Sequence, residues 1–309
     1  MKRRILFFAQ VLFLTLFILS LAGTIFQLAG DSSPLTQFDH KKDAAYNGFE
    51  AYDPSLSRLN SLRKLEQYCD SIYAEKVFSG SQGDFERTYT DIASNAVRNR
   101  FYHGYSYYGF EDNYLAALAS KVAMPGLSAL VIPDEILKHP FAACSQQSIV
   151  MMEVLKDKGF TTRKVTFMGK TYGGHFAFEV FYNNQWHFHD PNLEPDKAIL
   201  DSYGRPGIAY LAQHPDILVK AYNHLPATEV MDLFPNYAYG EPNKFPATKA
   251  VIYHKATKFL SYTLWIFFLL ALVIVRRKYL RVINNGRLNS MRMQSVSSSY
   301  YPDYKAQGA

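Results

Sequence analysis

Cysteine is scarce in this sequence, with only Cys69 and Cys144 among 309 residues. Two thiols are too few for a disulfide-stabilised scaffold or for a zinc site made of four thiolates. Proline and glycine are also few, at 14 and 17 residues, and charged residues make up 19% of the chain against 48% apolar residues. This composition excludes a collagen-like or intrinsically disordered chain. The sequence therefore predicts a folded protein, with 23 Tyr and 23 Phe to supply its core.

Positive charge is lacking in the part of the chain that would have to bind nucleic acid. The net charge is +6, but residues 31–257 hold 22 Lys and Arg against 26 Asp and Glu, a net charge of −4. The positive excess lies in residues 1–30, at +3, and in residues 258–309, at +7. Basic residues that flank apolar runs are typical of a membrane orientation signal. We therefore expect a membrane partner and no nucleic acid.

The first apolar run covers residues 5–29 and contains no charged side chain. Its 25 residues are long enough to span a bilayer. A cleaved signal peptide is the alternative, because Lys2, Arg3 and Arg4 precede the run, but the apolar stretch is longer than such peptides have. We predict an N-terminal transmembrane anchor over residues 1–30, and under either interpretation the domain that follows is exported.

The second apolar run covers residues 259–275 and is followed by four basic residues at 276, 277, 278 and 281. A buried core helix is the alternative, but this pattern is more typical of a transmembrane stop. We predict a transmembrane helix with its basic flank over 258–282 and a disordered cytoplasmic tail over 283–309. Both termini would then lie in the cytoplasm, with residues 31–257 outside the cell (inner) membrane. The chain has no Asn-x-Ser/Thr sequence, which favours a bacterial envelope with a periplasmic domain.

Near Gly159 the sequence pattern of the exported part changes from helical periodicity to short runs of β-type residues. We predict helices over 55–77, 85–101, 111–122 and 145–158, and strands over 161–168, 175–181 and 185–190. The strands would form an antiparallel meander covered by the preceding helices, which is an α+β fold. Residues 196–250 are predicted to mix helix and loop, with no function assigned to them.

Cys144 lies at the start of the helix predicted over 145–158. The unpaired N–H groups and the dipole of a helix N-terminus favour thiolate over thiol, which prepares a nucleophile. A histidine can then exchange the proton, and a carboxylate behind it can orient the ring. His175 and Asp190 are the candidates for these two roles.

The spacing of His175 and Asp190 is compatible with direct contact. If Asn183 and Asn184 form a two-residue turn, paired positions sum to 367 and the two residues are diagonal neighbours on one face of the sheet. A turn longer or shorter by one residue would put them on opposite faces. The arithmetic therefore supports a Cys144-His175-Asp190 triad.

These residues, with their surroundings, resemble the transglutaminase-like superfamily. The order Cys, His, Asp matches, as do a Gly-x-x-x-Arg at Gly159 and Arg163, a Glu at 179 and a Trp at 186 ahead of Asp190-Pro191. The resemblance covers roughly residues 140–195. It departs from the common family pattern at Ala142-Ala143 and Ala177, which bear on the substrate groove.

The resemblance implies a papain-like, transglutaminase-like domain between the two transmembrane helices. It implies that Cys144 is the nucleophile, His175 the general base and acid, and Asp190 the residue that orients His175. The implied activity is acyl transfer or amide hydrolysis through a thioester, without a cofactor, on a peptide or an envelope polymer. Glu179 and Trp186 would be structural, and Arg163 would pair with an acid in the fold.

Three other patterns lead to weaker interpretations. His187 and His189 share a strand face, as zinc ligands often do, but they point away from His175 and Asp190, so we expect no metal. Gly169-Lys170-Thr171 lies between two strands and is interpreted as a turn, not a phosphate loop. A Cys69–Cys144 disulfide would silence the nucleophile, yet Cys69 already has a place on an apolar helix face.

The sequence thus predicts a membrane-anchored extracytoplasmic thiol enzyme, a cysteine-dependent acyltransferase or hydrolase. The alternative is a catalytically silent domain of the same fold that serves as a scaffold or adaptor in an envelope or surface-polysaccharide assembly. An intact triad argues for the enzyme.

Overall fold

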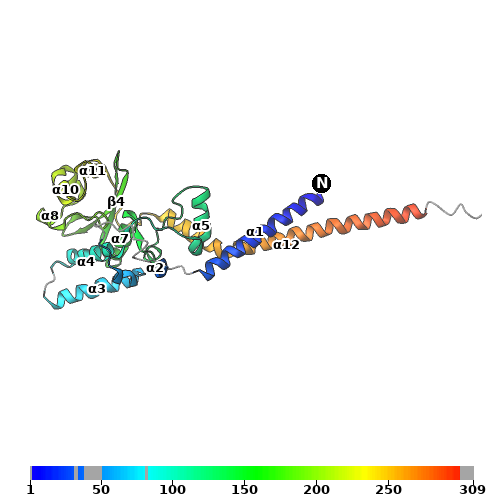
Figure 1. Ribbon diagram of the computed structural model, residues 1–309, viewed down its shortest axis with the longest axis horizontal. Coiled ribbons are helices and arrows are strands. Elements are labelled where there is room, and N and C mark those ends of the chain that lie inside the picture. Colours follow the sequence, from blue (N-terminus) through cyan, green and yellow to red (C-terminus); the bar gives the residue numbers. More distant parts are fainter. Residues whose placement is uncertain (1, 31–33, 38–50, 81–82, 300–309) are drawn as a thin grey trace, which may run out of the picture. The chain divides into compact units, whose positions relative to one another are not determined.

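The computed structural model describes residues 2–30, 34–37, 51–80 and 83–299 (Figure 1). The helices are α1 (Lys2–Ala29), α2 (Pro34–Gln37), the 3₁₀ helix η1 (Pro54–Arg58), α3 (Leu62–Phe78), α4 (Phe85–Arg100), α5 (Phe110–Val122), α6 (Pro133–Ile136), α7 (Cys144–Asp157), α8 (Lys197–Ser202), α9 (Ile208–Gln213), α10 (Pro215–Ala221), α11 (Ala227–Leu233) and α12 (Thr248–Ser299). The strands are β1 (Tyr102–His103), β2 (Phe141–Ala142), β3 (Thr161–Met168), β4 (Gly174–Tyr182), β5 (Gln185–His189) and β6 (Tyr237–Tyr239). The chain divides into two units, which are described separately below.

One unit contains α1, the first residues of α5 and α12 from Ala256 onward. Both α1 and α12 are long and apolar enough to cross a membrane. The Thr24 hydroxyl donates to the Ser261 carbonyl at 2.8 Å, and the Phe17 and Trp265 rings lie 6.5 Å apart. Phe17 precedes Thr24 on α1, whereas its partner Trp265 follows Ser261 on α12. The two helices therefore run antiparallel.

The helix α12 is longer than the sequence predicts. It continues as helix through Ser299, so the disorder predicted from residue 283 does not begin there, and residues 300–309 lie outside the described part of the chain. The physical reason is that no proline occurs between the apolar run and Pro302, and that a helix already started in the apolar run adds further residues at little cost.

The other unit is built around an antiparallel four-stranded sheet with the order β5-β4-β3-β6. The three predicted strands are confirmed as β3, β4 and β5, and β6 adds a short edge strand. A second, two-stranded sheet pairs β1 with β2 in parallel, and β2 ends two residues before Cys144. The observed class is therefore a mixed helix and antiparallel-sheet protein.

The sheet has an apolar core on each face. Phe178, Val180 and Tyr182 of β4 belong to one cluster with residues of α3, α4 and α7. Val165, Phe167 and Ala177 belong to another cluster with residues of α8 to α11. Figure 1 shows α4 and α7 on one side of β4, and α10 and α11 on the other. Both clusters follow from the alternation of side chains along a strand.

The predicted helices over 85–101, 111–122 and 145–158 are confirmed as α4, α5 and α7. The helix predicted over 55–77 is wrong in its first turn, which is the separate 3₁₀ helix η1. Its main part starts again at Leu62, because the Ser61 side chain accepts the N–H of Lys64 and caps a new helix.

Candidate functional site

Cys144 is the first residue of α7, as predicted. Gln146 anchors this helix start: its Oε1 accepts the N–H of Ala143 at 3.1 Å and that of Ser106 at 2.9 Å. Its Nε2 donates to the carbonyls of Ser106 and Leu130, both at 2.9 Å. A fully bonded and buried Gln146 therefore fixes the direction of the first turn, and Cys144 lies there half-buried.

The hairpin of β4 and β5 has the predicted register. Phe178 pairs with His189 and Val180 with His187, so paired positions sum to 367. Asn183 and Asn184 form the turn with φ values of 48° and 61°, which asparagine tolerates better than most residues. This register brings His175 and Asp190 together.

His175 and Asp190 form a buried pair. Nε2 of His175 lies 2.7 Å from Oδ2 of Asp190, and the two side chains are 6% and 0% exposed. A carboxylate accepts hydrogen bonds, so Nε2 carries the proton, and Nδ1 is the ring nitrogen left for a second partner. The Cys144 side chain lies near enough to His175 to raise the pKa of the imidazole. All three predicted site residues are thus in one cluster.

Electrostatics favour the charged form of this pair. Burial by itself would lower the pKa of His175, but the Asp190 carboxylate, its hydrogen bond to the ring and the nearby Cys144 side chain raise it to about 10. Burial would raise the pKa of Asp190, yet His175 and further hydrogen bonds hold it below its usual value. A basic imidazole beside a thiol is what a thiolate–imidazolium pair requires.

Asp190 has more partners than the sequence suggested. Its Oδ1 accepts the N–H groups of Asn192 and Leu193, both at 3.1 Å. Its Oδ2 accepts the Tyr222 hydroxyl at 2.9 Å, beside the bond to His175. Tyr222 was missed because it lies in the segment 196–250, which carries no motif. No periodicity or spacing in the sequence relates it to Asp190.

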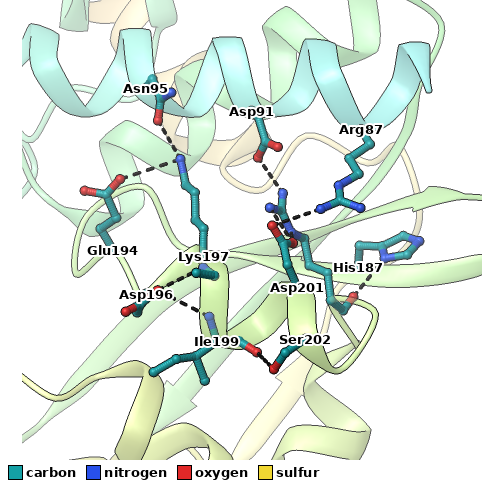
Figure 2. A network of polar contacts seen from close by, with 12 residues as sticks. Arg87, Asp91, Asn95, His187, Glu194, Asp196, Lys197, Ile199, Asp201 and Ser202 are labelled. Atoms are coloured by element: carbon teal, nitrogen blue, oxygen red, sulfur yellow. Dashed lines mark hydrogen bonds and ion pairs between the residues drawn. The ribbon is translucent and has the colours of Figure 1, made fainter. Parts of the chain in front are cut away.

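The segment that follows Asp190 is attached to α4 by a polar network (Figure 2). Arg205 pairs with Asp91 of α4 and with Asp201 of α8, the latter at 2.7 Å. The Lys197 ammonium donates to Asn95 of α4 at 2.6 Å. The Arg205 side chain is 4% exposed, whereas the side chains of Asp91 and Asp201 are 30% and 29% exposed. These contacts fix the chain directly after the site.

The remaining motif residues form a structural cluster, as expected. The Arg163 guanidinium lies 2.6 Å from Glu179, whose side chain is 0% exposed. It also lies between two rings, 4.0 Å from the centre of Trp186 and 3.7 Å from that of Tyr239. The expectation that Arg163 pairs with an acid is confirmed, and Glu179 also accepts the N–H of Ile208 at 2.7 Å.

His187 and His189 do not converge on a common ligand. The His187 ring is bonded to the carbonyls of Arg205 and Tyr182 at 2.8 and 3.2 Å, and the His189 ring stacks on Phe178. Within the described ranges there is no group of three His, Cys, Asp or Glu side chains suited to a metal. Gly169-Lys170-Thr171 lies in the connection between β3 and β4, as expected of a turn.

Cys69 lies on the apolar face of α3, where it was expected, and is fully buried. Burial, with a smaller contribution from Asp70, raises its pKa to about 12. Both cysteines are free thiols. Cys69 is therefore a buried small side chain and gives a useful internal control for Cys144.

Comparison of the chain with family models, with curated proteins and with solved structures gave no match. The observed class is a mixed helix and antiparallel-sheet protein with two helices apolar enough to cross a membrane. The particular activity, and the resemblance to the transglutaminase-like superfamily, remain predictions from residues and geometry.

Proposed function

We propose that this chain is a membrane-anchored thiol enzyme of transglutaminase-like, papain-like fold that transfers or hydrolyses acyl groups. One observation carries the proposal: Cys144 at the N-terminus of α7 lies next to His175 and raises its pKa, and Nε2 of His175 lies 2.7 Å from Asp190. A nucleophile, its proton acceptor and an orienting carboxylate are thus joined in that order. The substrate class that we propose is a peptide or an envelope polymer, with residues 31–257 outside the membrane and both termini inside.

The first half-reaction forms a thioester. The Cys144 thiolate attacks the carbonyl carbon of an amide, the C–S bond forms and the π electrons move to oxygen. The backbone N–H of Cys144 belongs to the first turn of α7, where N–H groups have no acceptor within the helix. It can therefore donate a hydrogen bond to this oxyanion. Collapse breaks the C–N bond, and the leaving amine takes the proton from Nδ1 of His175.

The second half-reaction releases the acyl group. Neutral His175 takes a proton from water or from an acceptor amine as its oxygen or nitrogen attacks the thioester carbon. The C–S bond breaks, and the products are a carboxylic acid or a new amide. The thiolate and the imidazolium are thereby regenerated, so the cycle needs no cofactor.

Alkylation of the two cysteines tests the nucleophile. The full-length chain in detergent is treated with iodoacetamide between pH 5 and 9, with and without reductant, and each thiol is followed by peptide mass spectrometry. We expect Cys144 to react rapidly at pH 6, because His175 stabilises its thiolate, and Cys69 to react slowly at every pH. In His175→Ala the rate at Cys144 should fall at least about tenfold at pH 6.

Two results would contradict the proposal. One is a rate at Cys144 that is as slow as at Cys69 and unaffected by His175→Ala. The other is labelling of Cys144 only after reduction, which would indicate a disulfide-locked site. Either result would leave the catalytically silent scaffold as the better interpretation.

A further inference from the structure

Tyr222 follows directly after α10 and is fully buried. Its hydroxyl donates to Oδ2 of Asp190 at 2.9 Å, the same oxygen that lies 2.7 Å from Nε2 of His175. One carboxylate oxygen is therefore shared between the imidazole and the phenol. The imidazole comes from strand β4 of the sheet, and the phenol comes from the residue that follows α10.

The phenol ring is held in this position by packing. The Phe234 ring stacks on Tyr222 with centroids 4.5 Å apart and lies 6.1 Å from the His175 ring in an edge-on arrangement. The His224 ring lies 6.1 Å from the Tyr222 ring in a tilted arrangement. Moving the Tyr222 ring, and with it the hydroxyl oxygen, away from Asp190 would require repacking of this aromatic cluster.

The groups that act on the pair are few and identifiable. Cys144 raises the pKa of His175. Hydrogen bonds from Tyr222 and from two backbone N–H groups stabilise the Asp190 carboxylate. Burial, with Asp190 next to it, raises the pKa of Tyr222 well above its ordinary value, so its hydroxyl stays a donor across the accessible pH range.

We propose that Tyr222 is a positioning residue of the candidate site, which sets how strongly Asp190 holds the protonated His175. The proposal rests on the proposed function, since it gives a role to the third member of the triad. A hydroxyl that bonds to Oδ2 draws negative charge from the oxygen that faces the imidazolium. It also fixes the carboxylate plane, so that Oδ2 stays directed at Nε2.

The sign of the expected effect follows from this sharing. Without the hydroxyl, the Asp190 charge acts on His175 alone, and the imidazolium is held more strongly. His175 should then lose its proton at a higher pH. A merely structural tyrosine would change stability without moving this titration.

The test uses the full-length chain in detergent with Cys144→Ser, so that His175 titrates without a neighbouring thiol. The nine histidines are labelled with ¹⁵N, and the His175 signal is assigned by its loss in His175→Gln. Tyr222→Phe should raise the His175 titration midpoint by about 0.5–1 pH unit. The matched control is Tyr89→Phe, which removes another buried hydroxyl that donates to a carboxylate, Asp70 at 2.9 Å, and should leave the midpoint unchanged.

A second variant keeps the test valid if Tyr222→Phe does not fold. Site-specific 3-fluorotyrosine at position 222 keeps the hydroxyl and makes it a stronger donor, so the midpoint should fall instead of rise. An unchanged midpoint in the variants that fold, or a shift of the opposite sign, overturns the role of Tyr222. That failure is distinct from failure of the proposed function, which is read from the alkylation rate of Cys144 in the chain that retains it.

Discussion

At the scale of single residues, the two buried carboxylates Asp190 and Glu179 have different partners. Asp190 pairs with a histidine and accepts hydrogen bonds from further donors. Glu179 on β4 instead pairs with the guanidinium of Arg163 and accepts the N–H of Ile208. Arg163 in turn is packed between two aromatic rings. The histidine beside Asp190 can gain or lose a proton, whereas the arginine beside Glu179 cannot, because arginine stays charged.

Loss of the Glu179 charge should therefore lower stability without a direct effect on the chemistry. In Glu179→Gln we expect the free energy of unfolding to fall by about 3 kcal/mol, because Arg163, whose side chain is only 18% exposed, loses its counterion. Urea unfolding of the full-length chain in detergent, with Trp265→Phe so that only Trp186 fluoresces, measures it.

The matched control for that change is Glu241→Gln. Glu241 lies 2.7 Å from Lys244, but the two side chains are 73% and 61% exposed, so the loss should stay below about 1 kcal/mol. Equal losses in the two variants would mean that the Arg163–Glu179 pair is no more than a surface ion pair.

At the scale of elements, α11 holds the connection between β3 and β4. The Asp232 carboxylate accepts the backbone N–H groups of Lys170, Thr171 and Tyr172 at 3.1, 2.9 and 3.1 Å. These bonds, that to Thr171 first, lower the pKa of Asp232. Because β4 begins at Gly174, the clamp fixes the chain immediately before His175.

Removal of this clamp should loosen the connection while the sheet stays intact. In Asp232→Ala we expect amide hydrogen exchange at residues 170–172 to become about tenfold faster, because three N–H groups lose their acceptor. Asp216→Ala is the control, since Asp216 forms an exposed pair with Lys220 at 3.6 Å. Unchanged exchange at residues 170–172 would show that the connection is held by other contacts.

At the scale of the whole molecule, the antiparallel helices α1 and α12 bear on the arrangement in the membrane. A hairpin of two spanning helices brings both ends of the chain to the same side, and basic residues lie at 2–4 and 276–281 on those ends. Basic residues are retained on the cytoplasmic side. This supports the proposed location of residues 31–257 outside the membrane.

A reporter fusion tests this arrangement. A reporter enzyme active only in the cytoplasm, joined after Ala309, should be active, and a reporter active only outside should be inactive there. The control joins each reporter after residue 257, before the second apolar run, where the two activities should be reversed. An outside signal after Ala309 would overturn the proposed topology.

Much of the site could be predicted because its determinants are local in sequence. The turn at Asn183 and Asn184 determines the register of its own hairpin, and that register decides whether His175 faces Asp190. The start of α7 at Cys144 follows from the apolar periodicity after it. By contrast, the break at Ser61 and the extension of α12 were missed, because capping and propagation change helix ends without altering the apolar pattern.

By itself the sequence determined two apolar helices, a three-stranded meander and a Cys-His-Asp order with spacings that allow contact. Only the tertiary structure decided that Tyr222 shares an oxygen of Asp190, that Asp232 holds the chain before His175 and that Arg205 attaches the chain after Asp190. The physical reason is distance along the chain. These partners are separated by more than 30 residues, and which of many polar residues meet across such separations depends on how the layers pack, which no local pattern encodes.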